Sequence, residues 1–277
     1  MFGLILVTAS AILDEISTSI GKWEVSHKKE GLYTYGFLNS FWILVVLSIV
    51  ALTKGSFVFS LDSLPLFSVL VVLEVAQLYA SLHAIVFAER ATNGFLMILT
   101  LPLLTVVDYV LGYDISLLAF CGIGVIVLGL IFLFINHGLN KKGIGYVLFT
   151  TVNAVATISL YKYLITHYNS VEGQQIVMFA ILSVYLFVMS VWKSKQNPLT
   201  FLFKKEFLVQ SIPRGIGGVL ISFAYLFAPA SIITSAKRAT LVLAAVISGK
   251  TYFHEKHFLV KMISVVLVVF GVVLLTQ

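Results

Sequence analysis

The chain has 277 residues, of which 60% are hydrophobic and only 11% are charged, and its formal net charge is +6. A soluble domain carries about 25% charged residues, so this composition excludes a water-facing globular protein. The basic residues stand between apolar runs, so membrane topology explains the positive charge better than nucleic-acid binding does. The single cysteine, Cys121, excludes an intramolecular disulfide.

Apolar runs of about 20 residues, the length that crosses the hydrocarbon core of a bilayer, recur along the whole chain. Each run should form a helix, because hydrocarbon contains no water to satisfy free backbone groups. We therefore predict an all-α membrane protein. Its ten transmembrane helices are expected at residues 2–21, 33–53, 64–88, 92–112, 115–135, 144–165, 173–192, 207–229, 232–249 and 257–276.

An internal repeat organises these spans. Two stretches about 140 residues apart have matching spans and joints, which is the signature of a repeated unit. The alignment places Glu74 opposite Arg214. We predict one transmembrane domain built from two five-helix repeats, residues 1–138 and 139–277. Because five is an odd number, the second repeat enters the membrane upside down. Inverted repeats of this kind recur in secondary transporters, with the solute site near mid-depth.

Basic residues are concentrated in the joints after the first, third, fifth, seventh and ninth spans. These joints contain Lys22, Lys28, Lys29, Arg90, Lys141, Lys142, Lys193, Lys195, Lys204, Lys205, Lys250, Lys256 and Lys261. The opposite side holds at most Lys54, Lys162, Lys237 and Arg238. Cytoplasmic loops are enriched in Lys and Arg, so we predict a multi-pass plasma-membrane protein with these joints in the cytoplasm and both termini outside.

Two turns in the sequence resemble those of a known family. The second copy reads YFHEKHFLVKMISVVLVVFGVVLL, with Glu255 in the turn, and the first reads VLGYDISLLAFCGIGVIVLGLIFL, with Asp114 there. Together with Pro102 in the fourth span and the APAS joint before the ninth, they resemble the EamA-type branch of the drug/metabolite transporter superfamily. The resemblance covers essentially the whole chain. It implies a five-plus-five helix fold and transport, but its mostly apolar pattern says little about the substrate.

The same acidic turns also have a simpler interpretation. Asp114 and Glu255 stand just before or in the first turn of a helix, where a carboxylate satisfies free N–H groups and the helix dipole. His254 and His257 flank Glu255. One crowded joint without a second His or Cys cluster is not a convincing metal-ligand set, so we interpret both histidines as interfacial anchors and expect no metal.

Ionisable side chains inside the spans are the strongest functional signal, because an unpaired charge in hydrocarbon costs several kcal/mol. Asp14 and Glu15 lie deep in the first span. Adjacent helical positions point about 100° apart, so the two need not share an environment. Each carboxylate either pairs with a basic residue of another helix or contacts the solute or a coupling proton.

Glu74 and Arg214 form the sharpest candidate pair, since they occupy matched places in the third and eighth spans. They either bridge or gate the cavity, or they bind opposite ends of a zwitterionic solute. We favour the bridge, because two opposite charges in one small cavity usually meet before a ligand arrives. Pro213 and the neighbouring glycines suggest a locally loosened helix there, and close helix packing is the alternative.

Weaker candidates complete the predicted site. Lys237 and Arg238 begin the ninth span, where cations are unfavourable unless an anion is near; snorkelling to the interface is the alternative. The polar and aromatic candidates for cavity lining, each also open to a packing role, are Tyr79, Asn93, Asn153, Tyr161 and Tyr225.

These features predict a secondary active transporter that moves a small polar or amphipathic metabolite, amino acid-like or amine-like, by alternating access. A proton is the candidate coupling ion. The alternatives are a flippase for a lipid or lipid-linked headgroup and an intramembrane enzyme. The sequence contains no HExxH, GxSxG or buried His pair, which disfavours the enzyme. We expect a small solute and the bilayer as partners, no nucleic acid, no cofactor, and a monomer or homodimer.

Overall fold

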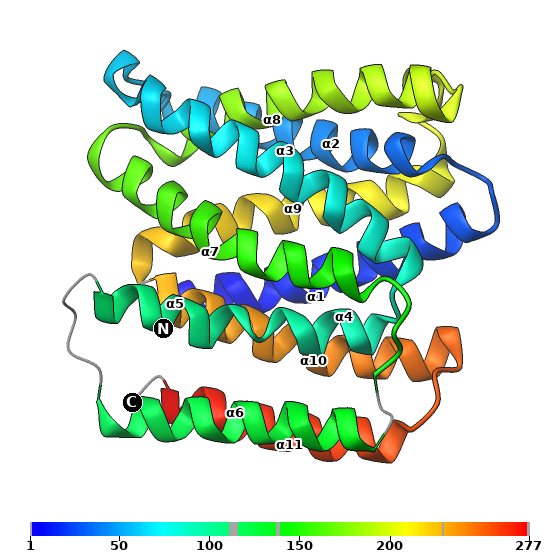
Figure 1. The fold of residues 1–277 in the computed structure, drawn as a ribbon. Helices are drawn as coiled ribbons and strands as arrows, with labels where there is room; N and C mark the ends of the chain where they lie inside the picture. Colours follow the sequence, from blue (N-terminus) through cyan, green and yellow to red (C-terminus); the bar gives the residue numbers. More distant parts are fainter. Residues whose placement is uncertain (1, 111–115, 137–138, 229, 276–277) are drawn as a thin grey trace.

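A computed structural model describes residues 2–110, 116–136, 139–228 and 230–275, and within these ranges the regular structure is helical throughout (Figure 1). Asp114 and Pro229, on which two of the expectations above rest, lie outside the described residues. The main helices are α1 (Phe2–Ser26), α2 (Leu32–Lys54), α3 (Leu64–Phe87), α4 (Arg90–Met97), α5 (Thr100–Val110), α6 (Leu117–Ile135), α7 (Ile144–His167), α8 (Val171–Met189), α9 (Lys205–Phe227), α10 (Ala230–Phe253) and α11 (Phe258–Leu275).

Within the described ranges, eight helical segments are long and apolar enough to cross a membrane, counting α4 and the first part of α5 as one. The two remaining predicted spans correspond to shorter apolar helices, Phe120–Ile135 and Phe258–Leu274. The all-α class is therefore confirmed, and the repeated long apolar helices support a multi-pass membrane protein.

The predicted fourth span is divided into α4 and α5 at Ile98 and Leu99. Pro102 explains the break, because a proline ring clashes with the carbonyl four residues earlier and provides no N–H to bond it. That carbonyl belongs to Ile98, and it accepts instead from the N–H of Leu101 at 2.9 Å. The proline in α9 has no such effect, since α9 continues through Pro213 as one helix.

Close packing explains the glycines of α9 better than the loosened helix that we considered. A Cβ at Gly215 would lie 3.0 Å from the backbone of Trp42, and one at Gly218 would lie 2.9 Å from the side chain of Ile43. Both contacts are with α2, so small residues allow α2 and α9 to approach each other closely.

The helices pack in neighbouring pairs (Figure 1). α1 lies against α9 and α10, α2 against α8 and α9, α3 against α7, α4 against α10, and α6 against α11. By contrast, α3 and α8 meet at only a few positions. The α2–α9 contact is therefore close, whereas the α3–α8 contact is loose.

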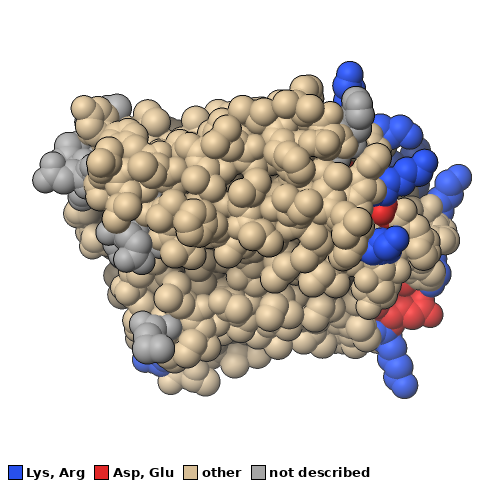
Figure 2. Space-filling view, turned by 90° about the horizontal axis from the view of Figure 1, so that it is seen from below, with Lys and Arg blue, Asp and Glu red and all other residues tan. Residues whose placement is uncertain are grey.

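Lysine and arginine side chains gather at one end of the molecule, as Figure 2 shows. The joints α1–α2, α6–α7, α8–α9 and α10–α11 lie at that same end in Figure 1. We call it the basic end. The uneven distribution of charge that the sequence indicated is therefore also a feature of the folded molecule.

Candidate functional site

A cavity of about 380 Å³ lies between α1, α2, α3, α4, α7, α8, α9 and α10. Nine of the eleven predicted site residues line it; the two that do not are Tyr79 and Asn153. Helices from both halves of the chain contribute charged and amide side chains to the wall. A cavity lined mostly by apolar groups, with a few polar and charged side chains converging on it, is the usual form of a ligand site, and charge at membrane depth marks function.

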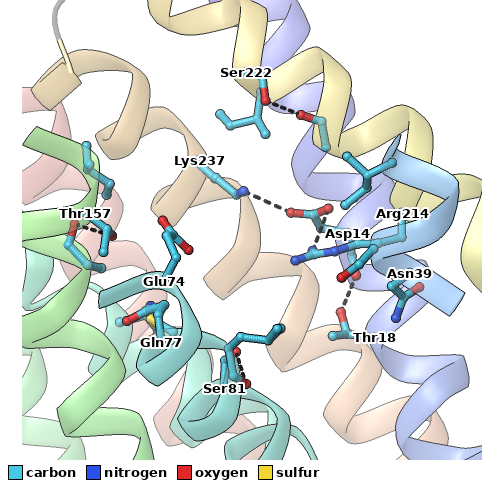
Figure 3. Close-up of a pocket in the computed structure, with 18 of the residues that line it drawn as sticks. Asp14, Thr18, Asn39, Glu74, Gln77, Ser81, Thr157, Arg214, Ser222 and Lys237 are labelled. Atoms are coloured by element: carbon cyan, nitrogen blue, oxygen red, sulfur yellow. Dashed lines mark hydrogen bonds and ion pairs between the residues drawn. The ribbon is translucent and has the colours of Figure 1, made fainter. Parts of the chain in front are cut away.

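Asp14 stands at the centre of the cavity wall and binds two cations (Figure 3). Its Oδ1 lies 2.8 Å from Nη1 of Arg214, and its Oδ2 lies 3.0 Å from Nζ of Lys237. Asp14 is buried, whereas the side chain of Arg214 is 37% exposed. One carboxylate on α1 therefore holds α9 and α10 together, and its two partners still reach the cavity.

The predicted bridge between Glu74 and Arg214 is wrong. Arg214 pairs with Asp14 because α1 packs directly along α9, whereas α3 packs on α7 at the other side of the cavity. Within the described part of the chain, Glu74 has no hydrogen bond and no ion pair. Its carboxyl group points into the cavity, towards the wall that carries Lys237 (Figure 3).

Glu15 has a different partner from Asp14. Its carboxylate accepts from Nε of Arg90 at 3.2 Å and from Nη2 at 2.6 Å, and both side chains are buried. Ser248 of α10 donates to the same carboxylate at 2.6 Å. This two-point arginine pair ties α1, α4 and α10 together. Pairing with a basic residue of another helix, one of the two interpretations left open, is thus the arrangement found.

Glu255 stabilises a helix N-terminus, but not that of the helix that follows it. Its carboxylate accepts from the backbone N–H groups of Arg90 at 2.6 Å and Ala91 at 3.3 Å, which begin α4. Lys261 lies 2.9 Å from Glu255 and 3.2 Å from Glu89. The acidic turn after α10 therefore fixes the α3–α4 joint at the basic end of the cavity, as expected for an anion at free N–H groups.

A second buried carboxyl group lies outside the spans, in the α1–α2 joint. Glu30 is 2% exposed and accepts from Nε2 of Gln210 at 2.7 Å. Burial raises the pKa of Glu30 to about 8, the carboxylate of Glu24 adds to the rise, and the hydrogen bond from Gln210 opposes it. Glu30 therefore connects the basic-end joint to α9 through Gln210.

Two tyrosines line the cavity towards the end opposite the basic joints. Tyr161 donates to the carbonyl of Ser222 at 3.1 Å, and the hydroxyl of Tyr225 lies 3.2 Å from that of Thr234. The two rings are 5.7 Å apart, nearly perpendicular. They connect α7, α9 and α10 in that part of the cavity wall.

The remaining candidates separate into cavity and packing roles. Arg238 and Asn93 line the cavity, and Nε of Arg238 and Oδ1 of Asn93 are buried without a hydrogen-bond partner in the described residues. Asn153 instead donates to the Leu73 carbonyl and to Gln77, both at 2.9 Å, and so joins α7 to α3. Tyr79 lies on the face of α3 that is turned away from the cavity.

Sequence reasoning missed the amide side chains of the cavity, Asn39, Gln77, Gln174 and Gln175. The available signal was polarity within an apolar span, since a buried amide needs partners in hydrocarbon much as a charge does. Gln174 is fully buried, and its Nε2 has no partner among the described residues.

The arrangement defines a class of protein: a multi-pass helical membrane protein with an internal cavity lined by side chains of both charges. No protein-family model matches the sequence, and comparison with curated proteins finds no match. A function can therefore be inferred only from the residues of the cavity.

Proposed function

We propose that this protein is a secondary transporter for a small zwitterionic solute, amino acid-like in its charged groups. The observation that carries the proposal is a pair of unsatisfied groups that belong to residues lining one cavity. Glu74 has no partner on one wall, and Nε of Arg238 has none on another, in the described residues. A solute with an ammonium and a carboxylate group would satisfy both.

Lys237, which pairs with Asp14, would provide a second cation beside Arg238 for the carboxylate of the solute. Lys237 shares Asp14 with Arg214, so it has only part of one counter-charge. A solute carboxylate near Lys237 and Arg238 would compete with Asp14 for Lys237. Binding would then change the contact between α1 and α10, which couples the occupied site to helix packing.

The helix contacts support an inverted repeat of residues 1–138 and 139–277. If α1 corresponds to α7 and α3 to α9, the α1–α9 contact has its counterpart in α7–α3. Likewise, the contact of α1 with α10 has its counterpart in the contacts of α7 with α4 and α5. The remaining contacts each pair a helix of the first repeat with its own equivalent in the second: α2 with α8, α4 with α10, and α6 with α11. Ten spans in two inverted halves are the arrangement that these contacts favour.

The largest departure from this symmetry among the described residues lies in one pair of contacts. The close α2–α9 contact would correspond to α8–α3, which is loose. In an inverted-repeat transporter, exchanging the close and loose contacts turns the cavity from one side of the membrane to the other. The asymmetry therefore supports alternating access. We propose that the basic end faces the cytoplasm of a plasma membrane, with both termini outside.

Solute binding and transport test the proposal together. The purified protein would be titrated with amino acids and its melting temperature recorded. Each amino acid would be compared, in a separate titration, with the primary amine that lacks its carboxylate and with the carboxylic acid that lacks its amine. We expect the zwitterions to stabilise the protein most. Uptake into liposomes, with and without a pH gradient, then separates binding from transport and tests the coupling proton.

Glu74→Gln is the decisive variant, with Glu206→Gln as its control because Glu206 is exposed at the start of α9. We expect Glu74→Gln to weaken zwitterion binding by about tenfold, which is ~1.4 kcal/mol, and to leave the acid analogue unaffected. Equal binding of amine, acid and zwitterion would overturn the solute class, and liposomes that accumulate none of them would overturn transport.

A further inference from the structure

A groove of about 770 Å³ lies on the outer surface of the bundle, between α3, the beginning of α7 and α8. It shares no lining residue with the charged cavity, because the two face opposite sides of α3. Gly145 lies in its wall, and a Cβ added there would meet no atom within 4 Å. The groove is therefore an open space beside the helices.

The groove changes from apolar to polar along its length. Val72 and Phe149 are exposed at its apolar part, and Lys141 lies at the basic end of the molecule. Gly143 of the groove wall lies against Phe87, the last residue of α3, and from Val72 to Phe87 is about 22 Å at 1.5 Å per residue. This is roughly half of a 40–45 Å bilayer including headgroups, so the groove is about as long as one phospholipid.

Tyrosine hydroxyl groups line the polar part. Tyr79, Tyr146 and Tyr185 belong to the groove, and none of their hydroxyls has a hydrogen-bond partner within the described ranges. The ring of His83 stacks beside two of them, 4.3 Å from the ring of Tyr79 and 5.1 Å from that of Tyr146. The rings of Tyr79 and Tyr146 are thus held by packing, while the O–H groups of all three tyrosines remain available as donors to a ligand.

We propose that this groove binds one anionic phospholipid of the leaflet at the basic end. The acyl chains would lie along Val72 and Phe149, and the phosphate would lie near Lys141, within reach of tyrosine hydroxyls. The anionic preference follows from charge: Lys141 is in the groove, Lys142 is its neighbour, and basic side chains at a membrane surface attract anionic lipids. The proposal is independent of the transported solute.

The test uses delipidated full-length protein in mild detergent, titrated with phosphatidylglycerol or with phosphatidylcholine of the same acyl chains. Bound lipids are counted by native mass spectrometry, and melting temperature is recorded in parallel. We expect phosphatidylglycerol to bind more tightly and to raise the melting temperature more. Gly145→Leu fills the groove and should remove one bound lipid.

Charge and steric controls are available elsewhere in the chain. Lys141→Gln should weaken phosphatidylglycerol binding about fivefold, the factor expected for one basic side chain near the membrane surface, and leave phosphatidylcholine unchanged. Lys250→Gln, exposed at the end of α10, should not have this effect. Gly124→Leu is the steric control, since a Cβ at Gly124 of α6 also meets no atom within 4 Å.

Three results would overturn the proposal. One is equal binding of the two lipids by the wild-type protein. Another is loss of the same lipid in Gly124→Leu as in Gly145→Leu. The third is a change from dimer to monomer in Gly145→Leu, which would assign the groove to a second copy of the chain. If Gly145→Leu fails to fold, the comparison of Lys141→Gln with Lys250→Gln decides.

Discussion

Removing Arg90 while keeping Glu15 is expected to destabilise the protein more than any surface charge mutation. Oε2 of Glu15 has Nη2 of Arg90, at 2.6 Å, as its hydrogen-bond partner, while Oε1 also accepts from Ser19 and Ser248. Arg90→Gln would therefore leave a buried carboxylate with one oxygen unsatisfied. Breaking a buried ion pair in this way costs about 3–5 kcal/mol.

The melting temperature in detergent measures this cost. Each kcal/mol lowers the midpoint of a domain of this size by about 2–4 °C, so we expect a decrease on the order of 10 °C for Arg90→Gln. The double variant Glu15→Gln, Arg90→Gln should recover most of the loss, because two amides need no counter-charge. Lys54→Gln is the control: Lys54 is 56% exposed in its pair with Glu172, and such pairs contribute at most ~1 kcal/mol. An Arg90→Gln shift no larger than that of Lys54→Gln would refute the reasoning.

Three further predictions concern acidity, orientation and the broken helix. The pKa of Glu30 is about 8 in the folded protein and 4.5 in the unfolded chain, so ionisation of its carboxyl group should lower the free energy of unfolding as pH rises from 4.5 to 8. Glu30→Gln should therefore flatten the pH dependence of the melting temperature over that interval. In a Cys121→Ser background, Lys142→Cys and Lys195→Cys should resist an impermeant thiol reagent on whole cells, and ready labelling of both would reverse the orientation. Pro102→Ala should slow deuterium exchange at the α4–α5 break, and unchanged exchange would mean that the proline does not cause it.

Helices could be predicted from the sequence because hydrocarbon restricts the backbone to a few solutions. Apolar length alone therefore located the helices. The break between α4 and α5 was not predicted, because Pro102 lies inside an apolar run as long as one span. Charged groups at membrane depth could also be predicted, since Asp14 and Glu15 interrupt an apolar run. Their partners were not visible, because the pairing depends on which helices touch.

The error about Glu74 and Arg214 shows this limit. Their matched positions in the repeat make them equivalent, and equivalent positions need not be in contact. Arg214 meets Asp14 because small residues of α9 face α1: a Cβ at Gly217 would lie 3.1 Å from Oδ1 of Asp14. Likewise, the helical period predicts that Tyr79 and Glu74 lie on different faces of α3. It does not predict which of the two faces is turned towards the cavity.

The charge balance of the cavity is the reason for proposing a zwitterion instead of a simpler solute. Arg90 is satisfied by Glu15, and Asp14 is shared between Arg214 and Lys237. What remains is one carboxyl group, Glu74, and the cations at Lys237 and Arg238, on separate walls. An amine would satisfy only Glu74, and a carboxylic acid would satisfy only the cations. Each would leave an unpaired group at low dielectric, which is costly. A solute with both charges leaves neither unpaired, so affinity should decrease when either end is removed.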